Sequence, residues 1–309
     1  MSAPAALANE RVAYLNGRFV PESECVVSFR DRGFKYGDAV FDMTRSFGHR
    51  IFKLKEHVER LYKSLKYLEI DPGLSPAEMI RLSEECFARN RHLLGPDDDY
   101  WLGQRISRGP GDSFEGQATP PATVIIECTP LPLKYRARLY RDGIDVIVPS
   151  VRRTPPDAMS PRAKTHNYIN LILGDLEAKA QDPEAWAVLL DHAGNLCEGI
   201  GSNIFLVRDG TLFTPRTQFV LPGVSRQHTF EMAEQIGVKV VEADLDLYDS
   251  YTADEAFLTS TSLCICPVRS VNGRRIADGK VPGPVTARLI EAYAKSVDCD
   301  FVAQYLKQL

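Results

Sequence analysis

The feature that most constrains this fold is a pair of closely spaced prolines before the middle of the chain. Residues 129–137 read Thr-Pro-Leu-Pro-Leu-Lys-Tyr-Arg-Ala. Because proline lacks a backbone N–H, two prolines this close exclude a helix interior or a central strand. We therefore predict an interdomain linker at 129–137, with a smaller domain at 1–128 and a larger one at 138–309. Both are long enough to bury a core.

The region before the linker alternates hairpin turns with amphipathic helices. Asn16-Gly17 lies between two short apolar stretches and predicts a two-residue β-hairpin, and 39–47 is strand-like. Leucine and valine recur every three or four residues from 54 to 68, which predicts a helix. The Ser75-Pro-Ala-Glu78 cap predicts a second helix to about residue 91, and strands are expected at roughly 100–107 and 122–128.

Strands and helices continue to alternate beyond the linker. Strands are expected at 143–150, 185–191, 202–208, 238–243 and 255–260, and helices near 168–181, 226–236 and 284–297. Asp209-Gly210 and Asn272-Gly273 predict two further hairpins. This order of elements predicts an α+β fold with mixed or antiparallel sheets.

Composition limits the classes of partner. With 37 Lys+Arg against 41 Asp+Glu, the net charge of −4 argues against a nucleic-acid partner. No apolar run approaches the roughly 18 residues of a membrane span, and the start does not resemble a secretory signal. The seven cysteines lack zinc or thioredoxin spacing, so we expect no metal site and mostly buried thiols. These observations predict a cytoplasmic protein with no membrane partner.

Four short segments contain residues that could take part in catalysis or ligand binding. They are Ala163-Lys-Thr-His-Asn-Tyr168, Leu196-Cys-Glu-Gly-Ile-Gly-Ser-Asn-Ile-Phe205, Leu221-Pro-Gly-Val-Ser-Arg226 and Leu258-Thr-Ser-Thr-Ser262. Each has an ordinary explanation when taken alone. A lysine such as Lys164 is usually solvated, Glu198 fits a turn carboxylate, and Pro222-Gly223 fits a turn before a helix. Arg60, at the flank of the leucine stripe, fits a surface charge.

Taken together, these segments resemble the class IV aminotransferases. The resemblance begins at Tyr14-Leu-Asn-Gly, takes in 31–41, 56–61 and the four segments in order, and ends near 283–286. The family includes branched-chain and D-amino-acid aminotransferases, (R)-selective amine transaminases and aminodeoxychorismate lyase. Membership implies the two-domain fold-type IV architecture, with a small N-terminal α/β domain and a larger C-terminal domain. It also implies pyridoxal 5′-phosphate (PLP) as the cofactor.

The resemblance assigns one catalytic residue and two residues that bind the ring of the cofactor. Lys164 corresponds to the catalytic Schiff-base lysine, which exchanges the cofactor with the substrate amine and moves the proton. Glu198 resembles the carboxylate that keeps the pyridine nitrogen protonated, so that the ring withdraws electrons. Tyr168 is placed to hydrogen-bond the phenolic oxygen of the cofactor, although a core tyrosine opening a helix is the alternative.

The cofactor phosphate requires hydrogen-bond donors, and the resemblance supplies four. Val224 and Ser225 stand where the N–H groups of a helix N-terminus point outward. Thr261 would add a hydroxyl from a turn after a strand. Arg60 resembles the arginine that clamps the phosphate with a forked charge, with His57 one turn earlier as structural support.

Five residues are candidates for substrate binding. Tyr36, Phe41 and Arg45 match the strand that faces the cofactor in the family. Strand periodicity places Phe41 and Arg45 on one face, although an Arg45 that points to solvent is the alternative. Arg105 offers a second grip on a substrate carboxylate, and Ser262 offers turn N–H groups.

The strand at 100–109 departs from the family patterns. It lacks the Tyr-x-Arg-Pro signature of branched-chain enzymes, and Gly103 leaves room that a larger residue would fill. Its Ser107-Arg-Gly109 ending is similar to the Thr-Arg-Gly of D-amino-acid and (R)-amine enzymes, yet their Arg-x-His trap is missing from 110–115. This combination predicts an aminotransferase of broad or mixed specificity.

The activity that the resemblance implies is a ping-pong transamination. The donor would be a branched-chain or other hydrophobic amino acid, a D-amino acid or an (R)-amine, and the acceptor a 2-oxo acid. The alternative is a PLP lyase of the aminodeoxychorismate-lyase type, which eliminates pyruvate with the same cofactor. The resemblance also implies a homodimer in which both subunits line each active site.

Overall fold

The computed structural model of the chain describes residues 9–111 and 121–309, which fall into two compact units. The N-terminal unit comprises Met1–Leu131 with Lys164–His166, and the C-terminal unit comprises Pro132–Ala163 with Asn167–Leu309. The expected linker holds the end of strand β6 (Thr123–Pro130) and the start of helix α4 (Leu133–Asp142). The short segment Lys164–His166 joins the N-terminal unit, which no sequence pattern indicated.

The N-terminal unit is built on a six-stranded antiparallel sheet with the order β2-β1-β6-β5-β3-β4. The remaining strands are β1 (Val12–Leu15), β2 (Arg18–Pro21), β3 (Ala39–Phe47), β4 (Arg50–Ile51) and β5 (Tyr100–Ser107). Asn16-Gly17 forms the two-residue turn between β1 and β2, because Leu15 pairs directly with Arg18.

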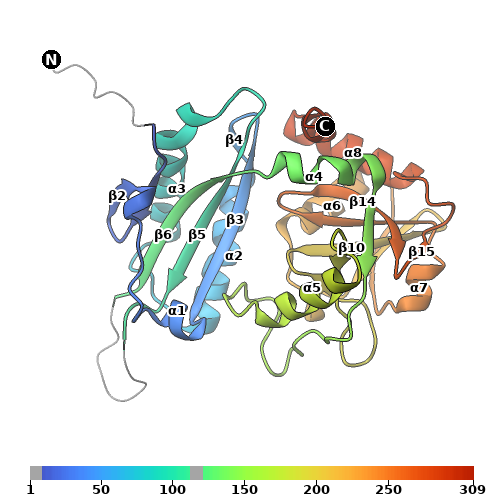
Figure 1. Cartoon of the computed structure of the whole chain (residues 1–309), viewed down its shortest axis with the longest axis horizontal. Helices are drawn as coiled ribbons and strands as arrows, with labels where there is room; N and C mark the ends of the chain where they lie inside the picture. The colour runs from blue at the N-terminus through green and yellow to red at the C-terminus, as the bar shows by residue number, and fades with distance from the viewer. Residues whose placement is uncertain (1–8, 112–120) are drawn as a thin grey trace. The chain divides into compact units, whose positions relative to one another are not determined.

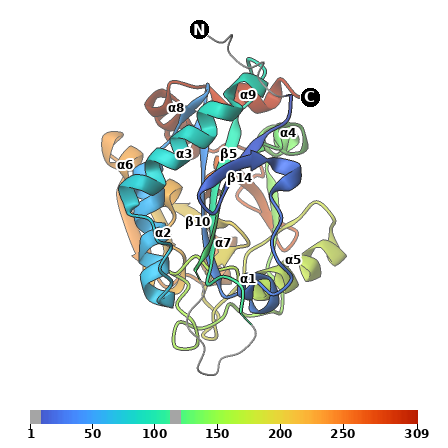
Figure 2. The ribbon, with the colours of Figure 1, turned by 90° about the vertical axis from the view of Figure 1, so that its left-hand side faces the viewer.

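Two long helices, α2 (Leu54–Leu68) and α3 (Pro76–Asn90), pack on one face of this sheet (Figure 1, Figure 2). Val58, Leu61 and Leu65 of α2 are buried in one core with Leu102 and Ile126 of the sheet. Each fully buried leucine contributes roughly 2 kcal/mol to stability. The shorter helices are α1 (Arg32–Tyr36), η1 (Glu22–Glu24) and η2 (Arg91–Leu93). The opposite face of the sheet carries half-buried side chains and holds the candidate site described below.

The C-terminal unit is built on a nine-stranded mixed sheet with the order β12-β11-β10-β13-β14-β7-β8, to which β15 and β9 add at β14 and β10. The β11–β12, β14–β7 and β7–β8 pairs are parallel and the others antiparallel. The strands are β7 (Ile144–Ile147), β8 (Trp186–Ala187), β9 (Glu198–Gly199), β10 (Ser202–Arg208), β11 (Thr211–Pro215), β12 (Val240–Ala243), β13 (Glu255–Ser260), β14 (Cys264–Val271) and β15 (Arg274–Arg275).

The helices of this unit are α4, α5 (Ile169–Gln181), α6 (Val224–Gln235), α7 (Leu247–Tyr251), α8 (Pro284–Val297), α9 (Phe301–Leu306) and the short η3 (Thr217–Phe219). Helices α6 and α8 pack together and against β13 (Figure 1). Aromatic rings fill the core: Phe205 and Phe257 stack with centroids 4.9 Å apart, and Tyr140 stacks on Tyr305 at 4.5 Å.

Most predicted elements are confirmed. The two helices at 54–68 and 76–91, the three hairpin turns and the strands at 39–47, 202–208 and 255–260 lie where the patterns indicated. The central strand β14 escaped prediction because Pro267 lies inside it, opposite Phe257 of β13, where a proline is unexpected. The strand expected at 185–191 is reduced to Trp186–Ala187. None of the helices in the described ranges is long and apolar enough to span a membrane.

Candidate functional site

Lys164 lies in a short extended segment beside the beginning of β3. The Phe41 N–H donates to the Lys164 carbonyl at 3.0 Å, and the His166 N–H donates to the Ala39 carbonyl at 2.9 Å. Between them Thr165 forms a bridge with Val40. The sheet of the N-terminal unit therefore fixes the backbone of the lysine through main-chain hydrogen bonds.

Helix α2 holds the same lysine through Ser64. The Lys164 N–H donates to Ser64 Oγ at 3.0 Å, and that hydroxyl donates to the Arg60 carbonyl at 3.1 Å. The Lys164 amine lies 4.4 Å from the centroid of the Phe41 ring. The sequence pattern gave no sign of Ser64, although its position four residues after Arg60 places both on one face of the helix.

Arg60 belongs to a buried charge cluster with Asp42 and His57. Its Nε donates to Asp42 Oδ2 at 2.8 Å and its Nη2 to Asp42 Oδ1 at 2.7 Å, while His57 Nδ1 lies 2.7 Å from Oδ1. Burial alone would raise the pKa of the Asp42 carboxyl, but Arg60 and His57 outweigh it and hold the pKa well below its usual range. Burial, together with the charges of Arg60 and Lys164, lowers the pKa of His57 although Asp42 raises it. The cluster thus contains one cation and one anion, and it fixes Arg60 in place.

The open face of the N-terminal sheet gathers further polar groups around Phe41. The Arg105 guanidinium carbon lies 5.5 Å from the Phe41 centroid, and Arg105 Nε donates to Glu127 Oε1 at 3.0 Å. The His166 ring meets Phe41 edge to face at 5.2 Å. Burial, together with Arg105 and Lys164, lowers the pKa of His166 to about 4 despite Asp31, so this ring is neutral at neutral pH. Phe41 therefore forms an apolar platform shared by a lysine, an arginine and a neutral histidine.

Two further expected substrate residues are Arg45, which is buried, and Tyr36, which is exposed. Arg45 is fully buried; its Nε donates to the Ser46 carbonyl at 2.9 Å, and its guanidinium lies 3.7 Å from Asp99 and over the Phe47 ring. The solvent-pointing alternative is wrong, because the side chain is buried with Asp99 and Phe47. Tyr36 ends α1 and is 45% exposed, with Lys35 and Arg32 near its ring.

The C-terminal unit provides a buried carboxylate at Glu198 in β9. Its side chain accepts from Arg153 Nε at 3.0 Å on one oxygen and from the Leu221 N–H at 2.8 Å on the other. A carboxylate has about four acceptor positions, so both oxygens keep capacity for a further donor. No motif marked Arg153, which lies in a loop before Thr154-Pro-Pro.

The loop from Leu221 leads directly into α6. A side chain at Gly223 would come within 2.3 Å of Asn203 Oδ1, so only glycine allows this approach. Asn203 Nδ2 in turn donates to the Leu221 carbonyl at 3.1 Å. The first backbone bond of α6 runs from Gln227 to Gly223, which leaves the N–H groups of Val224 and Ser225 without a carbonyl acceptor inside the helix. A helix end with such N–H groups is chemically suited to an anion, and here one loop ties it to Glu198.

The remaining predicted cofactor residues also lie in the C-terminal unit. Thr261 and Ser262 form the turn between β13 and β14; the Ser262 hydroxyl accepts from Arg136 and its carbonyl accepts from Tyr305 at 2.6 Å. Tyr168 is the N-cap residue of α5 and is half-buried. The turn and the helix start are thus both anchored by the unit's own core.

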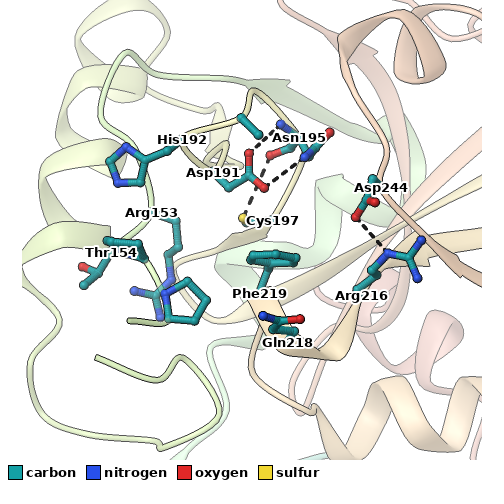
Figure 3. A pocket seen from close by; sticks show the side chains of 13 residues that line it. Arg153, Thr154, Asp191, His192, Asn195, Cys197, Arg216, Gln218, Phe219 and Asp244 are labelled. Atoms are coloured by element: carbon teal, nitrogen blue, oxygen red, sulfur yellow. Dashed lines mark hydrogen bonds and ion pairs between the residues drawn. The ribbon is translucent and has the colours of Figure 1, made fainter. Parts of the chain in front are cut away.

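A pocket of about 440 Å³ lies behind Arg153 in this unit (Figure 3). Arg153 and Cys197 form part of its wall, and Arg216 at its rim pairs with Asp244 at 2.9 Å. Burial, with Asp191 and Glu198 nearby, raises the pKa of Cys197 to about 12 and keeps it a thiol. Arg153 therefore links the wall of this pocket to the Glu198 carboxylate.

Comparison with known proteins shows the family to which this chain belongs. The model of the family described as amino-transferase class IV matches residues 39–271. The chain belongs to this family. A putative branched-chain-amino-acid aminotransferase of Methanocaldococcus jannaschii is 38% identical over 282 residues, covering 91% of this chain and 94% of its own.

Other class IV aminotransferases are similar over nearly the whole chain. A D-alanine aminotransferase of Bacillus licheniformis is 28% identical over 91% of this chain and 95% of its own. The structure of a T.th. branched-chain amino acid aminotransferase with pyridoxamine 5′-phosphate has a TM-score of 0.84 and 30% identity, covering 93% of this chain and 94% of that one.

The cofactor of this class IV aminotransferase is PLP. Each unit contains groups that fit it: the Lys164 amine and the fixed guanidinium of Arg60 in the N-terminal unit, and in the C-terminal unit a carboxylate at Glu198 that is joined through Leu221 to the first turn of α6. When bound, PLP supplies an aldehyde for the substrate amine and a protonated ring that withdraws electrons.

Proposed function

We propose that this class IV aminotransferase moves the amino group of a hydrophobic amino acid or amine to a 2-oxo acid by a ping-pong mechanism. The proposal rests on the Phe41 platform, where Lys164 and Arg105 both lie within 6 Å of one apolar ring. A reactive amine, a carboxylate-binding cation and an apolar surface are what an apolar amino acid requires. Relatives named for branched-chain and for D-alanine substrates support broad or mixed specificity.

The proposed roles follow from the local chemistry of each residue. Lys164 is the catalytic residue that holds the cofactor and moves the substrate proton. Arg60 binds the phosphate as a fixed guanidinium, together with the N–H groups of Val224 and Ser225. Glu198 keeps the pyridine nitrogen protonated, because both its oxygens retain acceptor capacity. The Thr261 hydroxyl donates a further hydrogen bond to the phosphate, and the Tyr168 hydroxyl donates one to the phenolic oxygen of the cofactor.

The proposed substrate residues are Tyr36, Phe41, Arg105 and Ser262. Phe41 supplies the apolar surface, and Arg105 is the carboxylate grip favoured by its position beside that ring. Arg45 is left out, because its guanidinium is buried against Asp99 and Phe47.

A half-reaction screen tests this function. The holoenzyme is mixed separately with L-leucine, D-alanine and (R)-1-phenylethylamine, and conversion of PLP to its amine form is followed by absorbance. We expect at least one donor to bleach the cofactor, and 2-oxoglutarate or pyruvate to restore it. Absence of any spectral change would contradict the proposal. Pyruvate release from aminodeoxychorismate without an acceptor would instead favour the lyase.

We also propose that the enzyme is a homodimer with shared active sites. Helix α5 exposes an apolar stripe at i, i+3, i+4 and i+7, made of Ile169, Ile172, Leu173 and Leu176, which are 38–65% exposed (Figure 1). Such a stripe is typical of a helix that packs against a partner. Light scattering should report a dimer that Leu173→Glu converts to monomer and Leu306→Glu on α9 does not. A monomeric wild-type enzyme would refute this part. A cytoplasmic location stays a prediction.

A further inference from the structure

We propose that Glu127 is a specificity-determining residue that competes with the substrate carboxylate for Arg105. The inference rests on the proposed aminotransferase function and concerns how this chain selects among donors and acceptors. No sequence motif marked Glu127, and it contributes nothing to the cofactor residues.

The pair lies on the open face of the N-terminal sheet. Arg105 on β5 pairs across the ladder with Ile125, and Glu127 on β6 with Gly103, so the two side chains are diagonal neighbours. Nε and Nη2 of Arg105 both lie 3.0 Å from Glu127 Oε1. Diagonal partners on neighbouring strands are within reach of long side chains. Glu127 therefore holds one edge of the guanidinium against β6.

Gly103 provides the space in which this pair forms. A Cβ at that position would lie 3.0 Å from Glu127 Oε1 and 3.1 Å from Met43 Cε. Both contacts are tighter than a side chain normally accepts, so a larger residue would displace the carboxylate or the methionine. The glycine that interrupts this strand is thus what allows Glu127 to reach Arg105.

The pair remains accessible to a ligand. The Arg105 side chain is 38% exposed and the Glu127 side chain 22%, whereas Asp42 beneath Arg60 is fully buried. In the described parts of the chain Arg105 hydrogen-bonds through Nε and Nη2 to Glu127 alone, so the Nη1 edge is left for a second acceptor. The second Glu127 oxygen accepts from Thr129 Oγ1, which orients the carboxylate.

Competition for Arg105 makes carboxylate binding weaker than a lone arginine would give. A substrate carboxylate can share the guanidinium at Nη1 or displace Glu127, and in both cases it meets a like charge. The binding of a donor without a carboxylate does not depend on the Arg105–Glu127 pair and requires only the apolar platform. Glu127 thereby narrows the difference in affinity between amino acids and amines without a carboxylate. An enzyme with a broad donor range requires such a small difference.

The test measures inhibition of the holoenzyme by 4-methylvalerate and by its neutral amide, which differ in charge at one group. In Glu127→Gln we expect the carboxylate to inhibit at least about threefold more tightly, because Arg105 is released. In Arg105→Gln it should inhibit at least about tenfold more weakly. The amide should change little in either variant.

A double variant separates competition from a general charge effect. In the Arg105→Gln background, Glu127→Gln should produce no further gain for the carboxylate. The matched control is Glu291→Gln, the same change at an exposed residue of α8 whose partner is Lys295. An equal gain in the Arg105→Gln background, an equal gain for the amide, or weaker carboxylate binding in Glu127→Gln would each overturn the proposal.

Failure of this inference is distinct from failure of the proposed function. If the wild-type holoenzyme is bleached by an amino donor but the two inhibitors respond alike to Glu127→Gln, only the role of Glu127 is refuted. If no donor bleaches it, the aminotransferase proposal itself fails.

Discussion

Asp42 in the N-terminal unit and Glu198 in the C-terminal unit are both buried carboxylates, yet they are satisfied in different ways. Asp42 is fully buried and accepts from Arg60 twice, from His57 and from the Met43 N–H. Glu198 is 4% exposed and accepts once on each oxygen, from Arg153 and from the Leu221 N–H.

The difference separates a structural carboxylate from one prepared for a ligand. Four protein donors bind Asp42, three on Oδ1 and one on Oδ2, so its charge serves to fix Arg60. Glu198 retains capacity, and the loop that supplies its Leu221 donor also begins α6. Burial alone therefore identifies neither as catalytic, whereas the number of protein donors distinguishes them.

The largest expected effect is that of Lys164→Ala. Only backbone atoms of Lys164 bond to Ser64 and Phe41, so the change should leave the N-terminal unit folded. Transamination should fall by at least about 10³-fold, because the amine that holds the cofactor and moves the proton is lost. Turnover and circular dichroism check both statements, with Lys55→Ala on the exposed face of α2 as the control. Near-normal turnover of Lys164→Ala would contradict the assignment of Lys164 as the catalytic residue.

Glu198→Gln tests whether the spare acceptor capacity in the C-terminal unit is used. The amide oxygen can still accept from one donor, but the negative charge that stabilises a protonated pyridine nitrogen is gone. We expect cofactor to remain bound and the proton-transfer step to slow by about 100-fold, measured as the rate of bleaching after mixing with a donor. A variant as fast as wild type would show that Glu198 is structural, like Asp42.

Asp42→Asn makes the same chemical change at the carboxylate that has four protein donors. Removing one partner of a buried ion pair costs about 3 kcal/mol or more, because Arg60 is left with an uncompensated charge. Apoprotein unfolding should therefore shift to lower temperature, and cofactor affinity should weaken through Arg60.

The double variant Asp42→Asn/Arg60→Met separates the effect on thermal stability from the effect on cofactor binding. It should regain part of the lost thermal stability, because no unpaired charge remains, while cofactor affinity stays low. If Asp42→Asn leaves the unfolding temperature unchanged, or Glu198→Gln lowers it by more, the contrast between the two carboxylates is wrong.

The two units also differ in how much the sequence could predict. Helices such as 54–68 and turns such as Asn16-Gly17 follow from local periodicity and turn chemistry, and both lie where expected. The C-terminal candidates come in contiguous segments, so Glu198, Val224 and Ser225 could be selected together. In the N-terminal unit the partners of the two site arginines are distant in sequence: Arg60 meets Asp42, and Arg105 meets Glu127.

Strand pairing decides those distant contacts, and period-two alternation gives only part of the answer. It correctly places Asp42 on the opposite face from Phe41, toward α2 and its arginine. It does not reveal that Arg45 is buried, because the fold brings Asp99, which precedes β5, to its guanidinium. Only the register of β5 against β6 brings Gly103 beside Glu127 and makes Arg105 a diagonal neighbour of that carboxylate.

The smallest expected effect concerns pH and the neutral histidine beside the Phe41 platform. The folded pKa of His166 is about 4, below the ordinary value of about 6.5, so the unfolded chain takes up a proton first as pH falls. Stability is thus lost between about pH 6.5 and 4; the shift corresponds to at most about 3 kcal/mol, and we expect about 1–2 because the ring is only partly buried. His166→Phe keeps an aromatic ring against Phe41 but cannot titrate. As pH falls from 6.5 to 4.5, the unfolding temperature of the wild-type apoprotein should fall more than that of this variant. Above pH 7 the two should respond to pH alike. The control His192→Gln, at an exposed site, should follow wild type throughout. Parallel pH profiles for His166→Phe and wild type would mean that the ring is solvated, and the platform would then lose its apolar character.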